Sequence, residues 1–463
     1  MTEKAQHLRG LSSEQKRAML KRMVAKREGG DTAESRSRDG APAVDGQNDG
    51  VAAIPESHYR FDKFPEYQQL HVQRAVGERA GIDNPFFVLH ESCAADTTVI
   101  EGREFYNFAT YNYLDMNGDP RVRDAAAEAM ARYGVSASAS RVVSGERPPH
   151  RELEAELARL HGAEDAIVFV SGHATNVSTI ATLVGPKDLV LHDRLIHNSQ
   201  LQGARLSGAS RRSFPHNDMD ALEELLAQER PRHQKVLICV EGLYSMDGDL
   251  APLERLVELK KRYKALLMVD EAHSTGVVGP TGGGVGEHFG VDGTDVDIWM
   301  GTLSKTLCGC GGFIAGSRAL IDILKFNAPG FVYSVGMPPG IAAACRKALE
   351  IMQAEPERVR KLQGNGRAFL EMCRARGLDT GTSDGYCVVP VIVGRSVLTA
   401  QLANALFARG VNVQPIIYPA VEERAARLRF FISSAHSHAQ LEHTANLIAE
   451  ELTRLRAQSE VAE

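Results

Sequence analysis

Short apolar runs separated by helical patterns occupy residues 120–330, and they constrain the fold more than any other feature of the sequence. Runs of this length that end in glycine or polar residues are typical of buried β-strands. Strands that alternate with helices form βαβ units, whose strands lie parallel in one sheet. We therefore expect an α/β fold built on a mostly parallel sheet. The clearest runs are residues 166–170, 189–191, 236–240, 265–269 and 297–300.

The rest of the chain divides into segments of different character. Residues 29–50 are rich in Gly, Asp, Ser and Ala without periodicity, as in a flexible linker. Strand patterns return at 387–393 and 428–433, followed by a helical pattern from about 438 to 456, which predicts a smaller α+β domain. The predicted division is 1–55 for a flexible extension, 56–118 for an N-terminal segment, 119–335 for a large domain and 336–463 for a small one.

Polar residues follow two of the predicted strands where each strand ends. Asp270 and His273 follow the run 265–269, and Lys305 follows the run 297–300. Ligands of open α/β sheets bind at the carboxyl edge of the strands, so we expect these groups to meet there. An enzyme that uses pyridoxal 5'-phosphate (PLP) needs a lysine for the Schiff base and an aspartate beside the pyridine nitrogen. The pattern predicts a PLP enzyme.

Each residue alone has a simpler interpretation. Lysines are mostly exposed, and an aspartate after a strand can merely cap a helix. Lys305, however, lies between an apolar strand and the Gly/Cys-rich stretch 308–312, where the sequence forms no charged face. The combination therefore favours a functional role.

Small and polar residues also follow the other predicted strands. The turn 171–176 leads into a helical pattern and would expose backbone N–H groups suited to a phosphate. His197 follows the next strand and is either a cofactor contact or a structural histidine. Ser245 precedes a turn in which Asp247 and Asp249 shape the loop.

Together with further motifs in the same order, these residues are similar to the α-oxoamine synthases, a family of fold-type-I PLP enzymes. The resemblance implies a large domain with a mostly parallel seven-stranded sheet and a smaller C-terminal α+β domain. It covers the chain from about Asn84 to His443. The matching motifs are 111–114, 140–141 with Gly145 and 150–154, 171–176, 216–218, 245–249, 270–273, 301–305, 337–339, 427–429 and 434–436.

The resemblance also implies roles for individual residues. Lys305 would hold PLP and accept the Cα proton, Asp270 would pair with the pyridinium, and His273 would hydrogen-bond the ring oxygen. His197 would stack on the ring. Arg429 would bind the substrate carboxylate as a planar bidentate donor, with Arg427 as its rival. The remaining cofactor contacts would be Gly172, His173, Ser245, Thr302 and Ser334, and Asn112 would contact substrate.

The reaction implied by the resemblance is a decarboxylative condensation. A small amino acid and an acyl thioester, carried on coenzyme A or an acyl-carrier protein, would give an α-amino ketone, CO2 and a free thiol. An aminotransferase or lyase on the same fold is the alternative, and a non-catalytic partner subunit is a third. The resemblance also implies a homodimer with active sites at the interface.

Three segments depart from the pattern of many relatives. Gly336 lies where relatives carry a hydroxyl, residues 136–140 replace a glycine-rich turn, and residues 419–420 replace a substrate threonine. These differences leave the amino acid and the acyl donor open. The pattern is more similar to family members attached to polyketide assembly lines than to the biotin and heme enzymes. We therefore hypothesise that the acyl donor is bound to a carrier protein.

The N-terminal extension contains a candidate docking element for such a carrier. A capping-box start at Ser12 leads into a narrow apolar stripe surrounded by lysines and arginines. A short basic amphipathic helix on a tether suits an acidic partner. The competing interpretation is a frayed surface helix without a partner.

Composition excludes several other classes. The formal net charge of −6 gives no reason to expect nucleic acid as a partner. No apolar stretch is long enough to span a membrane, and the polar start does not resemble a secretory signal. The 7 scattered cysteines fit reduced thiols in a cytoplasmic protein, and no second Cys/His pair joins Cys308 and Cys310 to form a metal site.

Overall fold

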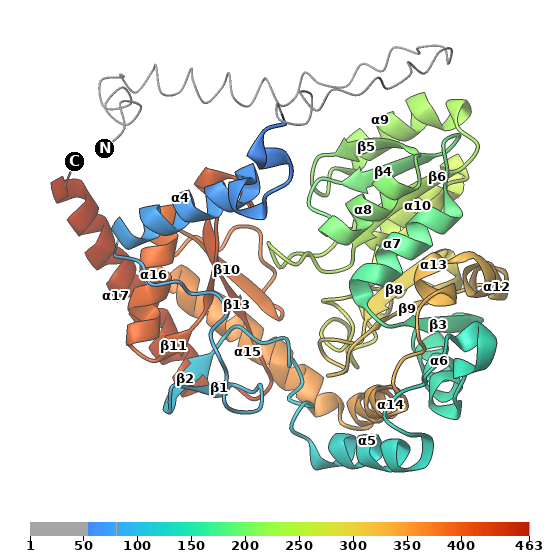
Figure 1. The fold of residues 1–463 in the computed structure, drawn as a ribbon, viewed down its shortest axis with the longest axis horizontal. Helices are drawn as coiled ribbons and strands as arrows, with labels where there is room; N and C mark the ends of the chain where they lie inside the picture. The colour runs from blue at the N-terminus through green and yellow to red at the C-terminus, as the bar shows by residue number, and fades with distance from the viewer. Residues whose placement is uncertain (1–53, 80, 463) are drawn as a thin grey trace, which may run out of the picture. The chain divides into compact units, whose positions relative to one another are not determined.

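The computed structural model describes residues 54–79 and 81–462, so the predicted docking helix lies outside the described residues. The chain divides into two units, residues 1–70 and 71–463. In the first, the described residues form two short 3₁₀ helices, η1 (Glu56–His58) and η2 (Phe61–Lys63), and the start of α4 (Pro65–Arg79). All other elements belong to the second unit (Figure 1).

The second unit contains the predicted seven-stranded sheet (Figure 1), with strands in the order β3-β9-β8-β7-β6-β4-β5. Its parallel pairs run from β8 to β5, and β9 is antiparallel to both of its neighbours. This arrangement confirms the predicted fold class. The strands are β3 (Asp165–Phe169), β4 (Leu189–Asp193), β5 (Ser210–Phe214), β6 (Val236–Glu241), β7 (Leu266–Asp270), β8 (Ile298–Thr302) and β9 (Gly312–Gly316).

Helices cover both faces of this sheet because most strand residues are apolar on both sides. Ile167, Val190 and Met268 pack on one face, against α7 (Gly172–Leu183), α8 (Asn198–Leu206), α12 (Arg318–Asn327) and α13 (Pro329–Val332). Their strand neighbours Val168, Leu191 and Val269 pack on the other face, against α6 (Pro148–Leu160), α9 (Met219–Glu229) and α10 (Leu253–Tyr263). The short helix α11 (Val285–Phe289) follows β7.

A smaller C-terminal lobe follows the large sheet. Its sheet is antiparallel, in the order β10-β13-β12, with strands β10 (Val388–Ile392), β12 (Gln414–Ile416) and β13 (Arg427–Phe431). A second small sheet joins the hairpin β1 (Thr97–Ile100) and β2 (Arg103–Asn107) to β11 (Val411–Asn412), which pairs parallel with β2. Helices α15 (Pro356–Ala375), α16 (Ser396–Ala408) and α17 (His438–Ala462) pack together in this lobe, whereas α5 (Pro120–Tyr133), which precedes the large sheet, packs against α14 (Pro339–Ala354).

Two further predictions concern the whole chain. The domain boundaries at 118/119 and 335/336 stay predictions. Strand β2, which precedes the first boundary, pairs with β11, which follows the second, so the predicted N-terminal segment and small domain share a sheet. In the part of the chain that the structure describes, we find no helix with the length and apolar character needed to span a membrane.

Candidate active site

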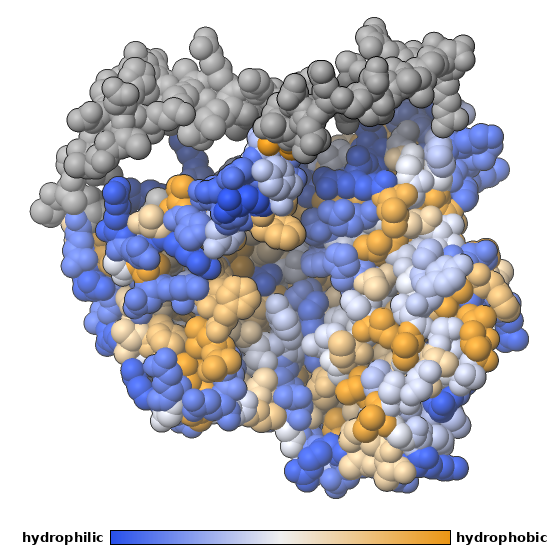
Figure 2. Space-filling view, in the orientation of Figure 1, coloured by the Kyte–Doolittle hydropathy of each residue, from blue (hydrophilic) through white to orange (hydrophobic). Residues whose placement is uncertain are grey.

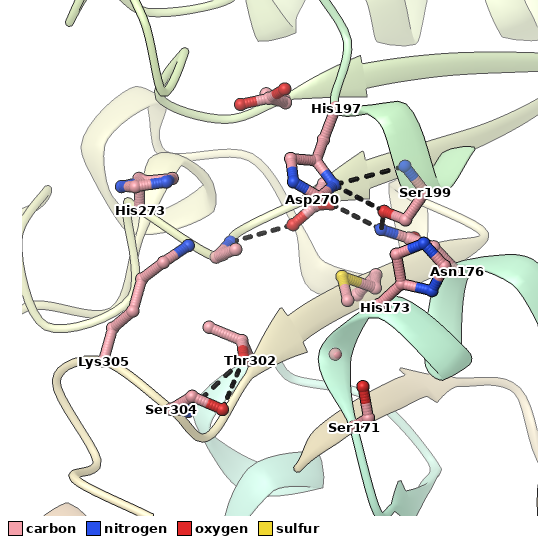
Figure 3. Close-up of a pocket in the computed structure, with 14 residues that line it drawn as sticks. Ser171, His173, Asn176, His197, Ser199, Asp270, His273, Thr302, Ser304 and Lys305 are labelled. Carbon is pink, nitrogen blue, oxygen red and sulfur yellow. Dashed lines mark hydrogen bonds between the residues drawn. The ribbon is translucent and has the colours of Figure 1, made fainter. Parts of the chain in front are cut away.

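A cavity of about 200 Å³ opens at the carboxyl ends of β6, β7 and β8 (Figure 3). Seven of the predicted site residues line it: Gly172, His173, His197, Asp270, His273, Thr302 and Lys305. The helices α7 and α8 also begin there. The expected meeting of polar groups at one sheet edge therefore occurs.

Asp270 is the last residue of β7 and is 3% exposed. Its Oδ2 accepts hydrogen bonds from Asn176 Nδ2 at 2.8 Å and Gln200 Nε2 at 3.2 Å, and its Oδ1 accepts from the Ala272 amide at 3.0 Å. Three donors fix the carboxylate in one orientation, and a buried carboxylate favours a positive charge beside it.

His197 caps the N-terminus of α8 and lines the cavity. Its Nδ1 lies 2.6 Å from Ser199 Oγ and accepts the Ser199 amide at 3.3 Å. Burial lowers the pKa of His197, opposed by the negative charge of Asp270 and aided by the positive charge of Lys305. The imidazole is therefore held by its Nδ1 side, as Figure 3 shows.

His273 lies near Lys305 in Figure 3. Its Nδ1 is 2.9 Å from the hydroxyl of Tyr113, a fully buried residue from the segment after β2. Burial lowers the pKa of His273 well below its usual value, and the positive charges of Lys305 and Arg429 add to this effect. His273 is therefore neutral at physiological pH.

Lys305 lies in the loop that follows β8. Burial lowers the pKa of its amine to about 8, although the charge of Asp270 opposes this effect. The ring of Tyr111 lies 5.8 Å from the amine nitrogen. An amine with this pKa is partly neutral near pH 7, as a nucleophile or base requires.

The start of α7 packs closely against the end of β8. Ser171 caps the helix by accepting the Ala174 amide at 3.4 Å, and Gly172 follows. A Cβ at Gly172 would lie 2.8 Å from Thr302 Oγ1, so only glycine allows this approach. Unpaired backbone N–H groups at a helix start favour an anion such as phosphate.

Four of the predicted site residues do not line the cavity: Ser245, Ser334, Asn112 and Arg429. Arg429 Nη1 donates to the Ser245 carbonyl at 3.0 Å, and Arg429 adds to the positive charge felt by His273 and His197. Asn112 is occupied within its own segment, where Oδ1 accepts the Met116 amide at 2.8 Å and Nδ2 donates to the Ala94 carbonyl at 2.8 Å. Ser334 is half-buried between α13 and α14.

The two candidate arginines differ in their partners. Arg427 forms an ion pair with Asp247 at 2.6 Å and also donates to the Met246 and Ala425 carbonyls. Arg429 Nε is buried without a hydrogen-bond partner. This difference favours Arg429 as the carboxylate ligand, and the assignment stays a prediction.

Two segments that depart from the family pattern lie side by side. The Gly336 amide donates to the Ala139 carbonyl at 2.9 Å. A Cβ at Gly336 would lie 3.2 Å from Ala137 Cβ and 3.1 Å from the Gly145 carbonyl oxygen. The missing hydroxyl at 336 and the altered turn 136–140 are therefore one local change.

Sequence reasoning missed Glu241, which also lines the cavity. It is 2% exposed at the end of β6, directly across from Asp270 in the sheet register. Its Oε2 accepts the Ser245 amide at 3.0 Å, whereas its Oε1 has no partner. Burial, aided by the charge of Asp270, raises its pKa to about 8. The signal was its place directly after the apolar run 236–240.

Comparison with known proteins agrees with this geometry. Residues 103–448 match the family described as aminotransferase class I and II. The chain is 41% identical to 8-amino-7-oxononanoate synthase of Symbiobacterium thermophilum over 79% of this chain and 92% of that one. Its fold is similar to serine palmitoyltransferase of Sphingomonas wittichii (TM-score 0.81, 28% identity, 85% and 98% covered). It is also similar to SPT with its PLP internal aldimine (TM-score 0.80, 29% identity, 84% and 98% covered).

The sheet, the cavity at its edge and the family model define a fold-type-I PLP-dependent transferase. Within that class, the chain belongs to the α-oxoamine synthases. Members of this family are PLP-dependent acyltransferases that join an amino acid to an acyl thioester with loss of CO2.

Proposed function

We propose that this cavity binds PLP and that the chain condenses a small amino acid with an acyl thioester, giving an α-amino ketone, CO2 and a free thiol. The observation that carries the proposal is the convergence of Lys305, Asp270 and His273 in one cavity at the carboxyl edge of the sheet. An aminotransferase or lyase would use the same three residues without consuming a thioester.

The residues present fit PLP. The close approach of Gly172 to Thr302 brings the start of α7 to the cavity, where its N–H groups suit the phosphate. The Asp270 carboxylate, fixed by three donors, suits a cationic ring nitrogen. Lys305 supplies the amine that holds the cofactor.

When bound, PLP supplies an electron-withdrawing ring that stabilises negative charge at Cα of the amino acid. Lys305 Nζ would hold the cofactor and would accept the Cα proton of the amino acid, because burial lowers the pKa of this amine to about 8. Arg429 binds the substrate carboxylate, and His273 donates a hydrogen bond into the cavity. His197 supports the ring through its Nδ1-anchored imidazole.

A thiol-release assay on the purified, PLP-loaded protein tests this function. It would combine glycine, alanine or serine with acyl-CoA and acyl-carrier thioesters of several lengths. We expect release only when both substrates are present, and a loss of at least about 1000-fold in Lys305→Ala. Lys347→Ala, a half-exposed lysine of α14, is the matched control. Amino-acid conversion without a thioester would instead establish an aminotransferase or lyase.

We also propose a homodimer. It is supported by exposed apolar side chains on the large lobe, the part of the second unit that contains the seven-stranded sheet. Figure 2 shows apolar patches on the visible face of this lobe. Six of the exposed apolar side chains are Val142, Val143, Ile323, Phe326, Tyr333 and Val335. Light scattering of the wild type should give twice the chain mass, and Phe326→Asp with Tyr333→Asp should give a monomer. Leu206→Asp, at an exposed leucine of α8, is the control. A monomeric wild type contradicts this proposal.

The predicted carrier-docking role of residues 1–55 remains a proposal that rests on the basic amphipathic pattern. Removing these residues should raise KM for acyl-carrier thioesters and leave KM for acyl-CoA unchanged. Equal KM values for carrier thioesters in both forms would contradict it. The cytoplasmic location expected from the reduced cysteines likewise stays a prediction.

A further inference from the structure

We propose that Tyr113 is a positioning residue that holds the single proton of His273 on Nε2, the nitrogen that faces the cavity. This inference rests on the proposed function, in which His273 donates a hydrogen bond to the bound cofactor. Tyr113 does not line the cavity and acts only through His273.

The hydroxyl of Tyr113 has a fixed place. The residue is fully buried, and its carbonyl accepts the Ser434 amide at 2.7 Å. Its hydroxyl lies 2.9 Å from His273 Nδ1. Ser433 Oγ donates to the neighbouring Asn112 carbonyl at 2.9 Å, so the segment is anchored to the C-terminal lobe at two points.

His273 carries one proton, because burial and the nearby cations keep it neutral. A neutral imidazole has one N–H donor and one acceptor nitrogen, so the Tyr113 hydroxyl decides which is which. If the hydroxyl donates to Nδ1, the proton is on Nε2. If it accepts from Nδ1, the nitrogen facing the cavity is an acceptor only.

The surroundings of the hydroxyl favour donation. Burial raises the pKa of Tyr113 well above its usual value, so its hydrogen remains and needs an acceptor. Besides His273 Nδ1, the nearby group is the Cys387 thiol, which donates to the His273 carbonyl at 3.5 Å and is a weak acceptor. A buried donor without a good acceptor is costly, so the Tyr113 hydrogen points to Nδ1.

The other nitrogen of His273 is free for the cavity. Among the described residues, Nε2 has no hydrogen-bond partner. It keeps some exposed surface, and His273 lines the cavity. His197 follows the same scheme, because its Nδ1 accepts the Ser199 amide. Two of the three histidines that line the cavity, His197 and His273, are therefore anchored through Nδ1.

The pH titration of the visible absorbance of the PLP-loaded protein tests this role without measuring turnover. A donor at Nε2 stabilises negative charge on the cofactor's ring oxygen most when the chromophore has lost its proton. Tyr113→Phe leaves this donor unfixed, and we expect the titration midpoint to rise by about one pKa unit. Tyr244→Phe removes a buried hydroxyl that has no hydrogen-bond partner and should leave the midpoint unchanged.

A double-variant cycle separates positioning from a general structural effect. On a His273→Ala background, adding Tyr113→Phe should shift the midpoint no further. An unchanged midpoint in Tyr113→Phe, or an equal shift on both backgrounds, would overturn the proposal.

A second measurement covers the case in which Tyr113→Phe does not fold or the protein does not bind PLP. ¹⁵N NMR of the wild type with labelled histidine reports the tautomer directly. An Nε2-protonated His273 supports the inference, and an Nδ1-protonated His273 overturns it. Failure to form the PLP chromophore at all would instead count against the proposed function.

Discussion

At the scale of single residues, the site places two carboxyls next to each other at the ends of neighbouring strands. Asp270 receives three hydrogen bonds, whereas Glu241 receives one from the Ser245 amide and has one oxygen without a partner. Two like charges this close are unfavourable, so the less solvated carboxyl keeps its proton. Glu241 is therefore the neutral member of the pair, with a pKa of about 8.

The protonation of Glu241 predicts a specific pH dependence of stability. The folded chain keeps this proton up to about pH 8, whereas the unfolded chain loses it near 4.5. Stability therefore falls as pH rises between these values, by on the order of a few kcal/mol. Glu241→Gln removes this loss, because glutamine has no carboxyl proton to lose. The melting temperature of the variant minus that of the wild type should therefore increase from pH 5 to pH 8. Glu128→Gln, at an exposed position of α5, should show no such trend. A constant difference across this range would mean that Glu241 is already ionised.

Sequence alone pointed to Asp270, which directly follows an apolar run, and to His273 and Lys305, which lie in the polar segments just after the ends of two such runs. Glu241 has the same position relative to its strand but belongs to no polar cluster in the sequence. Only the register, which sets Glu241 opposite Asp270, makes it part of the site. The hydroxyl of Tyr113 was similarly hidden, since its partner His273 lies 160 residues away.

At the scale of elements, the five predicted strands occur within one or two residues of their predicted bounds. Two strands of the sheet were not predicted. The strand β5 is the exposed edge and is largely polar, so it lacks an apolar run. The strand β9 begins and ends with glycine, and its antiparallel place between β3 and β8, one strand in from the edge, follows from pairing across the sheet.

The contact between α7 and β8 predicts the effect of a single methyl group. Gly172→Ala would bring its Cβ to 2.8 Å from Thr302 Oγ1, so the Thr302 side chain or the start of α7 must shift. We expect PLP to bind roughly tenfold more weakly, which is about 1.4 kcal/mol, as measured by absorbance titration. Gly185→Ala, after the C-terminal end of the same helix, has no heavy atom within 4 Å of its Cβ and is the matched control. Unchanged affinity in Gly172→Ala would show that this helix start does not contact the cofactor.

At the scale of the whole second unit, the loop 245–250 of the large lobe is held by the C-terminal lobe at several points. Arg427 and Arg429 of β13 bind Asp247 and the Ser245 carbonyl. Asp384 accepts the Leu250 amide at 3.0 Å, and Thr382 donates to Asp249 at 2.9 Å. Local sequence patterns cannot predict these contacts, because their partners are more than 130 residues apart.

This connection predicts that an ion pair outside the cavity controls substrate binding. In Asp247→Asn, the buried Arg427 guanidinium loses its charged partner, which costs up to about 3–5 kcal/mol when a buried pair is broken. Arg429 lies two residues along the same strand and contacts the same loop through the Ser245 carbonyl. We therefore expect a lower melting temperature and a KM for the amino acid that rises more than kcat falls.

The matched control is Asp124→Asn, because Asp124 forms a surface pair with Arg123 in which both side chains are over 70% exposed. Such pairs contribute about 0–1 kcal/mol, so this variant should keep the wild-type melting temperature and KM. If Asp247→Asn lowered the melting temperature but left the KM for the amino acid unchanged, the Arg427 pair would serve stability alone. The position of Arg429 would then depend on β13 and not on the loop that joins the two lobes.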